Sequence, residues 1–276
     1  MLVGLVAACG IDAVGQAILG PDRDEPDVRD AANADDRSAA DVEELDAGED
    51  ADIDALELDC GVCPLGFTCS LDAGCTDFAR PHFILTANPS VQWSWGTRSR
   101  DAAADVFAPM PVGVTDPANG IDQWSTADGS ITPGVFVNPS SSVIHPYGTF
   151  TMQPRQMAFH PGPNDERAIV RWTAPAARTY VARVVVVGLS GYNGAQITTT
   201  NVTVTRNGDG GTSVLGKTNV GHDGGAGSDA SVGPFTIDVP SSYFSAGDTL
   251  DVAVDYGQNA NFGYDSTGVD VTVFAP

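Results

Sequence analysis

A two-residue hydrophobic period that recurs between residue 80 and residue 276 limits the folds open to this chain more than any other feature. It is clearest in residues 250–256 and 269–273, where every second residue is apolar. Successive side chains of a β-strand point to opposite faces, so each run has one apolar and one polar face. Similar runs at 169–172, 180–189 and 202–204 are separated by Gly, Pro, Asn and Asp. Without alternating helices, the pattern predicts an all-β protein, an antiparallel jelly-roll β-sandwich over residues 80–276.

Most of the negative charge precedes this region. The chain has 276 residues and a net charge of −23, and residues 21–59 alone hold 17 acidic residues and three Arg. That segment has no aromatic residue, so it buries too little apolar surface to offset the entropy lost on ordering. We therefore predict a disordered acidic tether over residues 9–59. The alternative is an acidic helix with partly helical spacing of Val42, Leu45, Ile53, Leu56 and Leu58.

The charge balance also restricts the partners. Phosphate contacts need a basic face, and the chain has a single Lys, Lys217, so a nucleic-acid partner is excluded. No stretch reaches the roughly 18 apolar residues that span a bilayer. Contact with a membrane is therefore predicted only through a lipid anchor.

That anchor is predicted at Cys9. Val6, Ala7, Ala8 and Cys9 resemble the lipobox of a bacterial lipoprotein signal. The resemblance implies cleavage after residue 8, a diacylglycerol on the Cys9 thiol, and an exported protein anchored at the outer membrane or cell surface. Residues 1–8 form only part of such a signal, because they lack a basic region and a long apolar core, which suggests a start codon upstream. The alternative is an ordinary apolar N-terminus with a buried cysteine.

The four other cysteines, Cys60, Cys63, Cys69 and Cys75, are clustered. Residues 60–78 contain too few apolar side chains for a core of their own, so we predict a small disulfide knot with its connectivity open. Zinc is the competing interpretation, although only Cys60 and Cys63 have the spacing of a zinc knuckle. The CGxCPxGxxC pattern resembles short segments of exported myxobacterial-type proteins.

Six segments of the C-terminal region resemble an exported bacterial jelly-roll domain that recurs in secreted and surface-sorted proteins. They are residues 88–96, 134–139, 159–164, 170–175, 246–250 and 264–270, and the likeness spans residues 84–275. The resemblance implies a sandwich similar in build to galactose-binding-like carbohydrate modules, often found beside carbohydrate-active or adhesive modules. It implies no particular ligand.

Residues 80–276 are poor in the groups that catalysis needs. They contain a single Glu, Glu166, so a glycosidase dyad would have to be built from Asp. No GxSxG, HExxH or GxxxxGK[ST] motif occurs. These absences favour non-catalytic recognition of a glycan or another envelope component. An Asp-based carbohydrate-active enzyme and a purely structural surface protein are the alternatives.

Aromatic side chains are the first candidates for ligand contacts. Trp124 and Tyr192 lie in loop-like surroundings, and Tyr264 lies in a Gly/Asn-rich loop, flanked by Tyr256 and Phe262, that is a candidate rim. By contrast, Val91, Trp93 and Trp95 share one strand face and are predicted to belong to the core. Trp172, on the strand-like segment RAIVRWT, is a further core candidate.

The densest polar group contains His160 and Asn164 of the HPGPN segment, which is a candidate for contacts with sugar hydroxyls. The alternative is a plain turn into the next strand, with Arg171 paired to a carboxylate. No cofactor is predicted, apart from a structural calcium ion for which Asp265, Asp270 and Asp122 are candidate ligands.

Overall fold

The computed structural model describes Cys63 and residues 67–70, 74–99, 106–126, 130–189, 198–221, 233–257 and 261–276. Within these ranges the regular elements are antiparallel β-strands and short 3-10 turns, which confirms the all-β prediction and is compatible with a jelly-roll sandwich. None of the described helices is long and apolar enough to cross a membrane. The predicted lipobox with Cys9, the acidic tether, Cys60 and Tyr192 lie outside the described residues.

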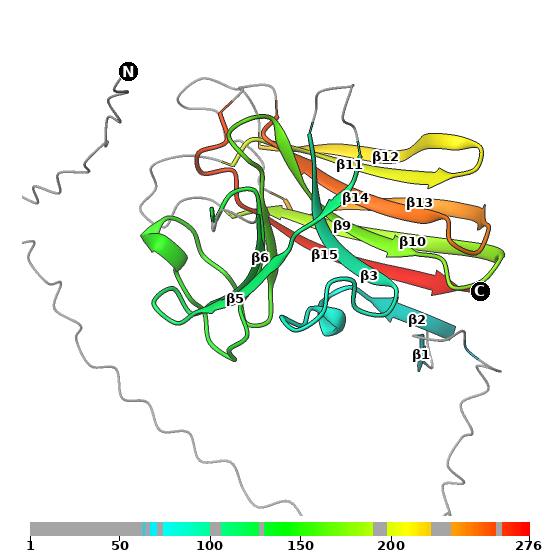
Figure 1. Ribbon diagram of the computed structural model, residues 1–276, viewed down its shortest axis with the longest axis horizontal. Coiled ribbons are helices and arrows are strands. Elements are labelled where there is room, and N and C mark those ends of the chain that lie inside the picture. Colours follow the sequence, from blue (N-terminus) through cyan, green and yellow to red (C-terminus); the bar gives the residue numbers. More distant parts are fainter. Residues whose placement is uncertain are drawn as a thin grey trace, which may run out of the picture. The chain divides into compact units, whose positions relative to one another are not determined.

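The first sheet is built on three long strands that lie side by side (Figure 1): β13 (Phe235–Phe244), β10 (Arg178–Gly188) and β15 (Thr267–Ala275). Two groups of shorter strands share the other edge of β15. At its start lie β8 (Met157–His160), β7 (Gly134–Val137), β6 (Ile121–Ser125) and β5 (Val112–Asp116). At its end lie β2 (Gly74–Phe78) and β1 (Thr68–Ser70).

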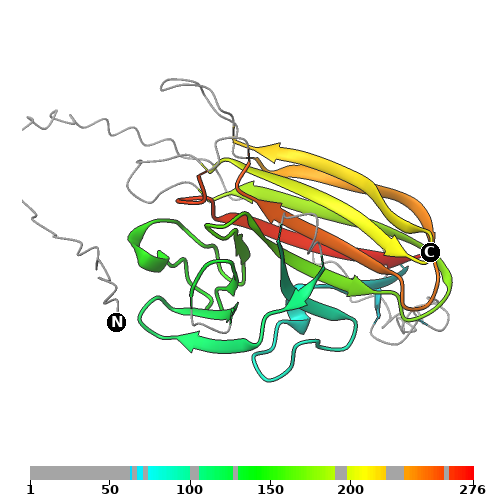
Figure 2. The ribbon, with the colours of Figure 1, turned by 45° about the horizontal axis from the view of Figure 1, so that its top comes forward.

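The second sheet has six strands, in the order β12 (Gly211–Val220), β11 (Thr200–Gly208), β14 (Thr249–Asp255), β9 (Glu166–Thr173), β3 (Trp93–Ser99) and β4 (Ala108–Pro109). The short 3-10 turns are η1 (Arg80–His82) and η3 (Pro146–Gly148). The segments of residues 106–160, drawn in green, gather beside the long strands in both ribbon views (Figure 2).

The inward faces of the two sheets form the main core. Trp93, Trp95 and Trp172 are each at most 1% exposed, so their predicted core placement is confirmed. The same prediction for Val91 is wrong: Val91 is 64% exposed, because it lies in the turn before β3 with a φ of 52° and does not continue the strand. The alternation predicted in β15 is also present, because Val269, Val271 and Val273 are buried and Asp270 is exposed. Burial of large rings and β-branched side chains on facing strands is the main source of stability in such a sandwich.

The outer face of β14 departs from the simple alternation. Asp251, predicted to face solvent, is fully buried under Arg98, Arg171 and Asn207. The Nε of Arg171 donates to Asp251 at 2.7 Å, and its guanidinium also lies 3.9 Å from the ring centroid of Phe107. Charge pairing therefore buries a residue that the alternation assigns to the surface.

The cysteine-rich segment is joined to the first sheet. Cys63 and Cys75 form a disulfide, and β2, which contains Cys75, pairs with the end of β15 through Phe78 and Thr272. Phe67 reaches the main core, with ring centroids 6.3 Å from Trp172 and 6.0 Å from Tyr180. One of the predicted bridges is thus present, and the segment it closes is packed on the core.

A second, smaller core lies on the outer side of the first sheet. Phe136 on β7 and Ala158 on β8 pack there with Phe150 and Met152, which follow η3. Residues 138–156 therefore cover the β7–β8 end of the sheet, and this cover shapes the pockets described below.

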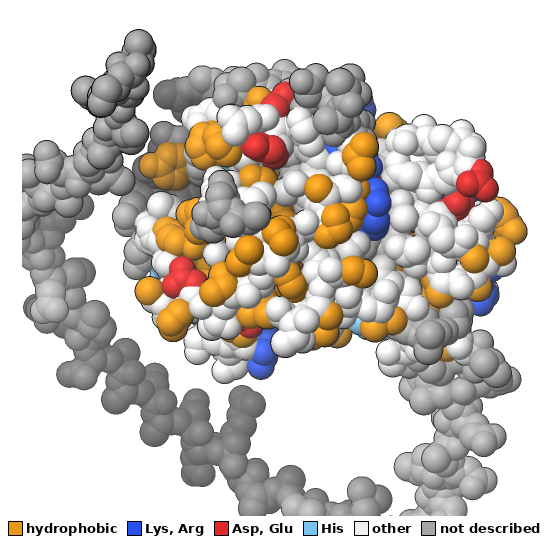
Figure 3. All heavy atoms as spheres, viewed as in Figure 1, with side chains coloured by type: hydrophobic (Ala, Val, Ile, Leu, Met, Phe, Trp, Pro, Cys, Tyr) orange, Lys and Arg blue, Asp and Glu red, His pale blue; other side chains and the backbone are white. Residues whose placement is uncertain are grey.

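The charge of the chain is unevenly distributed. On the face seen in Figure 3, hydrophobic side chains are interspersed with uncharged polar atoms, and few acidic side chains are visible. The acidic excess is greatest in residues 21–59 of the sequence.

Candidate functional site

A cavity with a volume of about 350 Å³ and a largely aromatic lining lies beside the smaller core. Six of its lining residues carry rings: Phe136, Tyr147, Phe150, His160, Phe262 and Tyr264. We call this cavity the aromatic pocket. Its remaining lining is small or aliphatic, with Ile131 and three hydroxyl residues among it.

Strand register brings these rings together from distant parts of the chain. Gly134 on β7 pairs with His160 on β8, and Thr267 at the start of β15 pairs with Phe159. The end of β8 therefore lies between β7 and the loop of residues 261–266 that leads into β15. This loop supplies Phe262 and Tyr264, and η3 supplies Tyr147.

Tyr147 is held by the β5–β6 hairpin. Its backbone N–H donates to Asn119 Oδ1 at 2.7 Å, and its hydroxyl lies 3.5 Å from both Asp116 Oδ2 and Gln123 Oε1. Burial and the negative charge of Asp116 raise the pKa of the Tyr147 hydroxyl to about 12. The hydroxyl therefore stays protonated at physiological pH.

Phe150 continues the same wall. Its ring centroid lies 6.5 Å from that of Tyr147 and 6.4 Å from that of Phe136. Phe136 and Phe150 also belong to the smaller core, so the floor of the pocket is fixed by packing.

His160 supplies a hydrogen-bond acceptor among these rings. Burial lowers the pKa of its imidazole, an effect partly opposed by a hydrogen bond to Pro161, so the ring is neutral at physiological pH. Its Nδ1 donates to the carbonyl of Pro161 at 2.8 Å. In this tautomer Nε2 carries the lone pair and is the ring nitrogen left for a ligand hydroxyl.

Two of the residues whose rings line the pocket have a strained backbone conformation. Tyr147 has a φ of 53° and Tyr264 a φ of 69°, both in the left-handed region that large side chains rarely adopt. Such conformations cost about 1–3 kcal/mol and persist where the surrounding structure imposes them. Tyr264 is 41% exposed despite its large ring, so its aromatic surface is available to a ligand.

Phe262 completes the site opposite the imidazole. Its ring meets that of His160 edge to face, with centroids 6.3 Å apart. The pocket thus combines aromatic faces, a neutral acceptor nitrogen and hydroxyl groups, and its described lining contains no Asp, Glu, Lys or Arg. This composition suits an uncharged ligand with apolar faces and hydroxyl groups.

The structure brings together two of the five predicted ligand residues, His160 and Tyr264, and adds the predicted rim residue Phe262. Asn164 lies in the adjoining turn, where its backbone N–H and side-chain amide both donate to Glu166, at 2.8 and 3.2 Å. This agrees with the turn interpretation of the HPGPN segment, as does the pairing of Arg171 with a carboxylate. Tyr192 lies outside the described residues.

The predicted loop position of Trp124 is wrong. Trp124 lies on strand β6, is only 4% exposed, and packs in the main core. The segment GIDQW looks like a loop because Gly120 and Asp122 flank Ile121, but Gly113 and Val135 pair with Trp124 from both neighbouring strands. A ring enclosed in this way does not face a ligand.

The three candidate calcium ligands do not form one group. Asp122 accepts from Thr115 on β5, Asp270 is exposed on β15, and Asp265 is buried beside Thr199. In the part of the chain that the structure describes, no cluster of three or more His, Cys, Asp or Glu residues is arranged to hold a metal ion.

Sequence reasoning missed Phe136, Tyr147 and Phe150 of the pocket. Phe136 lies in GVFV, a pattern typical of an ordinary buried strand. Phe150 is separated from the 261–266 loop by more than a hundred residues. The close spacing of Tyr147 and Phe150 in the segment HPYGTF is a local indication of an aromatic cluster. Only the pairing of β8 with β7 and β15 shows that this cluster lies at the same cavity as the other rings.

No protein-family model and no curated protein matches this chain. Among solved structures, the K2 cleaved adhesin domain of Lys-gingipain is similar, with 11% identity and a TM-score of 0.33, over 73% of this chain and 99% of that one. The catalytic domain of a GH87 α-1,3-glucanase in complex with nigerose has 14% identity and a TM-score of 0.24, over 67% of this chain and 29% of that one. The enzymatically active domain of tailspike protein 4 of bacteriophage CBA120 has 9% identity and a TM-score of 0.24, over 66% of this chain and 19% of that one. Similarity at this level does not identify a shared function.

Proposed function

We propose that this chain is an exported, lipid-anchored surface protein whose sandwich domain binds a glycan of the cell envelope or its surroundings without cleaving it. The lipid on Cys9 would hold the chain at the outer membrane or cell surface, and the acidic segment would extend the domain away from it. This order of parts rests on the sequence resemblances given above.

The observation that carries the binding proposal is the set of aromatic rings around one cavity with an acceptor nitrogen among them. Sugar rings present apolar C–H faces that stack on aromatic faces, and hydroxyl groups that need hydrogen-bond partners. Tyr264 and Phe262 supply the faces, and His160 Nε2 supplies an acceptor.

Two features favour binding over turnover. None of the described residues that line the pocket is a carboxylic acid, whereas glycoside hydrolysis generally needs a pair of them at a fixed separation. The floor is also built from core residues, which suits a preformed site.

A glycan array probed with the purified full chain, with release of reducing sugar followed in parallel, tests the proposal. Removing the rings with Phe262→Ala and Tyr264→Asn should weaken binding about tenfold or more. Asn is chosen at residue 264 because it tolerates the left-handed backbone there. Tyr243→Ala is the matched control, since Tyr243 is 56% exposed on β13 and does not line the pocket.

Each outcome has one interpretation. Binding without release, lost in the two pocket variants and kept in the control, supports the proposal. Release of reducing sugar would favour the Asp-based enzyme instead, and neither binding nor release would favour a structural surface protein.

A further inference from the structure

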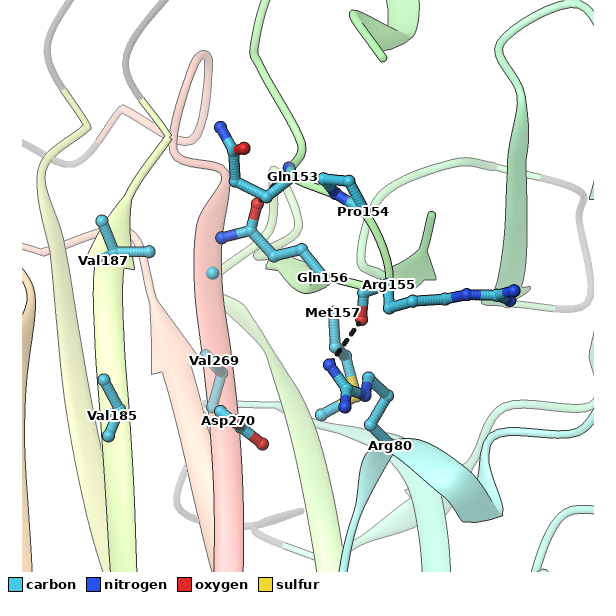
Figure 4. A pocket seen from close by; sticks show the side chains of 11 residues that line it. Arg80, Gln153, Pro154, Arg155, Gln156, Met157, Val185, Val187, Val269 and Asp270 are labelled. Atoms are coloured by element: carbon cyan, nitrogen blue, oxygen red, sulfur yellow. Dashed lines mark hydrogen bonds between the residues drawn. The ribbon is translucent and has the colours of Figure 1, made fainter. Parts of the chain in front are cut away.

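A second cavity, of about 210 Å³, lies on the outer face of the first sheet (Figure 4). It is bounded by the turn of residues 153–156, which precedes β8, by Arg80 of η1, and by strands β10 and β15. We call it the polar pocket. It is separate from the aromatic pocket, and the two share no lining residue.

The floor of the polar pocket is aliphatic. Val185 and Val187 point outward from β10, between inward-facing valines that are fully buried. Gly268 on β15 pairs with Val187 and leaves the floor open. A Cβ at residue 268 would lie 2.5 Å from Gln156 Nε2 and 2.7 Å from Val187 Cγ1, so a side chain there would displace the Gln156 amide and crowd Val187.

Planar polar groups surround this floor. The side chain of Gln156 is oriented by its own turn, because its Oε1 accepts from the backbone N–H of Gln153 at 2.8 Å. Its Nε2 is thereby left as a donor over Gly268. In the described part of the chain, the side chains of Gln153 and Asp270 make no hydrogen bond or ion pair with the protein.

Arg80 closes the lower side of the pocket. One Nη atom of its guanidinium donates to the carbonyl of Arg155 at 3.3 Å, the contact drawn as a dashed line in Figure 4. This bond holds one Nη beside the turn, and the other N–H groups of the guanidinium are potential donors to a ligand. The side chain of Arg155 itself extends away from the cavity in the same view.

We propose that the polar pocket is a second ligand site, which takes a single neutral sugar unit through hydrogen bonds. Neighbouring sugar hydroxyls each donate and accept, and the pocket offers amide donors and acceptors, a guanidinium donor and a carboxylate acceptor. Among the described lining residues, the guanidinium of Arg80 and the carboxylate of Asp270 face the cavity, so the groups directed into it include one charge of each sign. The valine floor matches the C–H face of a sugar ring.

The site is tested with methyl glycosides of glucose, galactose, mannose and N-acetylglucosamine, added one at a time to the full chain. Backbone and glutamine side-chain amide signals are followed by NMR. A binding glycoside should shift the signals of Gln153, Gln156 and Gly268 at millimolar concentration. Gln153→Ala and Asp270→Ala should each raise the Kd about tenfold, the effect of losing one or two hydrogen bonds to a charged or oriented group.

Two controls separate this site from the aromatic pocket and from folding defects. Tyr243→Ala removes a ring that is 56% exposed on β13 and lines neither pocket, and it should leave the Kd unchanged. Tyr264→Asn should also leave it unchanged, so the outcome here does not depend on the aromatic pocket. Absence of shifts with all four glycosides, or an affinity unaffected by both Gln153→Ala and Asp270→Ala, would overturn the proposal. So would stronger binding of glucuronate or inorganic phosphate than of any neutral glycoside.

Discussion

Trp93 donates a hydrogen bond from its indole N–H to a carboxylate oxygen of Asp77 at 2.9 Å, which joins β3 of one sheet to β2 of the other. The other carboxylate oxygen accepts from the indole of Trp172 at 3.1 Å, and His82 Nε2 lies 3.0 Å from the first. Asp77 is 1% exposed, and burial raises the pKa of its carboxyl against the opposing effect of these partners. A single acid thus fixes β2, the strand that contains Cys75 of the Cys63–Cys75 disulfide, to the tryptophan core.

Asp77→Ala should therefore be strongly destabilising. It leaves two buried indole N–H groups without an acceptor, and we expect a loss of about 3–5 kcal/mol in the free energy of unfolding, measured by urea denaturation. Asp238→Ala is the control, because Asp238 forms an exposed ion pair with Arg183 and its loss should change stability by less than about 1 kcal/mol. Equal effects of the two substitutions would contradict the bridging role of Asp77.

Trp124→Ala provides a direct test of the corrected placement of that ring. Truncation of a tryptophan that is enclosed in the core should lower the free energy of unfolding by about 3–5 kcal/mol. Tyr264→Asn, which removes a ring that is 41% exposed, should cost far less. If Trp124→Ala were as stable as the parent chain and instead lost glycan binding, the ring would belong to a site after all.

The sequence predicts the burial of a residue well where that burial depends on neighbours in the same strand, and poorly where it depends on residues from other strands. The alternation in residues 269–273 is predicted correctly, because there period two decides which face is buried. In β3 the burial of Trp93 and Trp95 is predicted correctly, but Ser94 on the opposite face is buried as well and Val91 before the strand is exposed. Asp251 was misplaced because its burial depends on Arg98 and Arg171, which come from two other strands. The sequence places Trp124 in a loop, wrongly, because the nearby Gly and Asp residues are typical of loops.

The site was only partly predictable for the same reason. His160 and Tyr264 stand out locally, one in a Pro-rich turn and one in a Gly-rich loop. The rings that complete the pocket, Phe136 and Phe150, are ordinary core residues by sequence. They gain a function only where β8 pairs with both β7 and β15, a non-local feature that single-sequence patterns do not contain.

The disulfide prediction extends beyond the bridge that the structure describes. Pairing of Cys63 with Cys75 leaves Cys60 and Cys69 as partners for the second bridge of the knot. If the chain is exported as proposed, alkylation of the isolated protein without reductant, followed by peptide mass spectrometry, should find no label on any of these four cysteines. Labelling of Cys60 and Cys69 together would show that the knot has one bridge.

Cys9→Ala should release the protein from membranes. The lipid predicted on its thiol supplies the anchor, so the variant should appear in the soluble fraction after cell fractionation. A conservative change elsewhere in the acidic segment, such as Asp36→Asn, should leave the distribution unaltered. Recovery of Cys9→Ala with membranes after a salt wash would contradict the lipoprotein assignment.

Asp265 carries the clearest pH dependence in the described structure. Its side chain is 1% exposed, Oδ1 accepts from the backbone N–H of Thr199 at 2.9 Å, and Oδ2 is buried without a hydrogen-bond partner. Burial raises the pKa of this carboxyl from 3.8 to about 7, despite the opposing hydrogen bonds from Thr199. The native state therefore retains a proton that the unfolded chain releases near pH 4.

The sign of the effect on stability follows from that difference. Between about pH 4 and pH 7 the native state binds more protons than the unfolded state, so the free energy of unfolding falls as the pH rises. Over the whole of this pH range, the free energy of unfolding falls by roughly 4 kcal/mol. Asp265→Asn imitates the protonated acid, so in urea denaturation it should match the parent near pH 4 and exceed its stability near pH 8. Asp209→Asn, in an exposed turn, should show no such crossover, and an Asp265→Asn variant that is less stable than the parent at both pH values would contradict the protonated state of this buried acid.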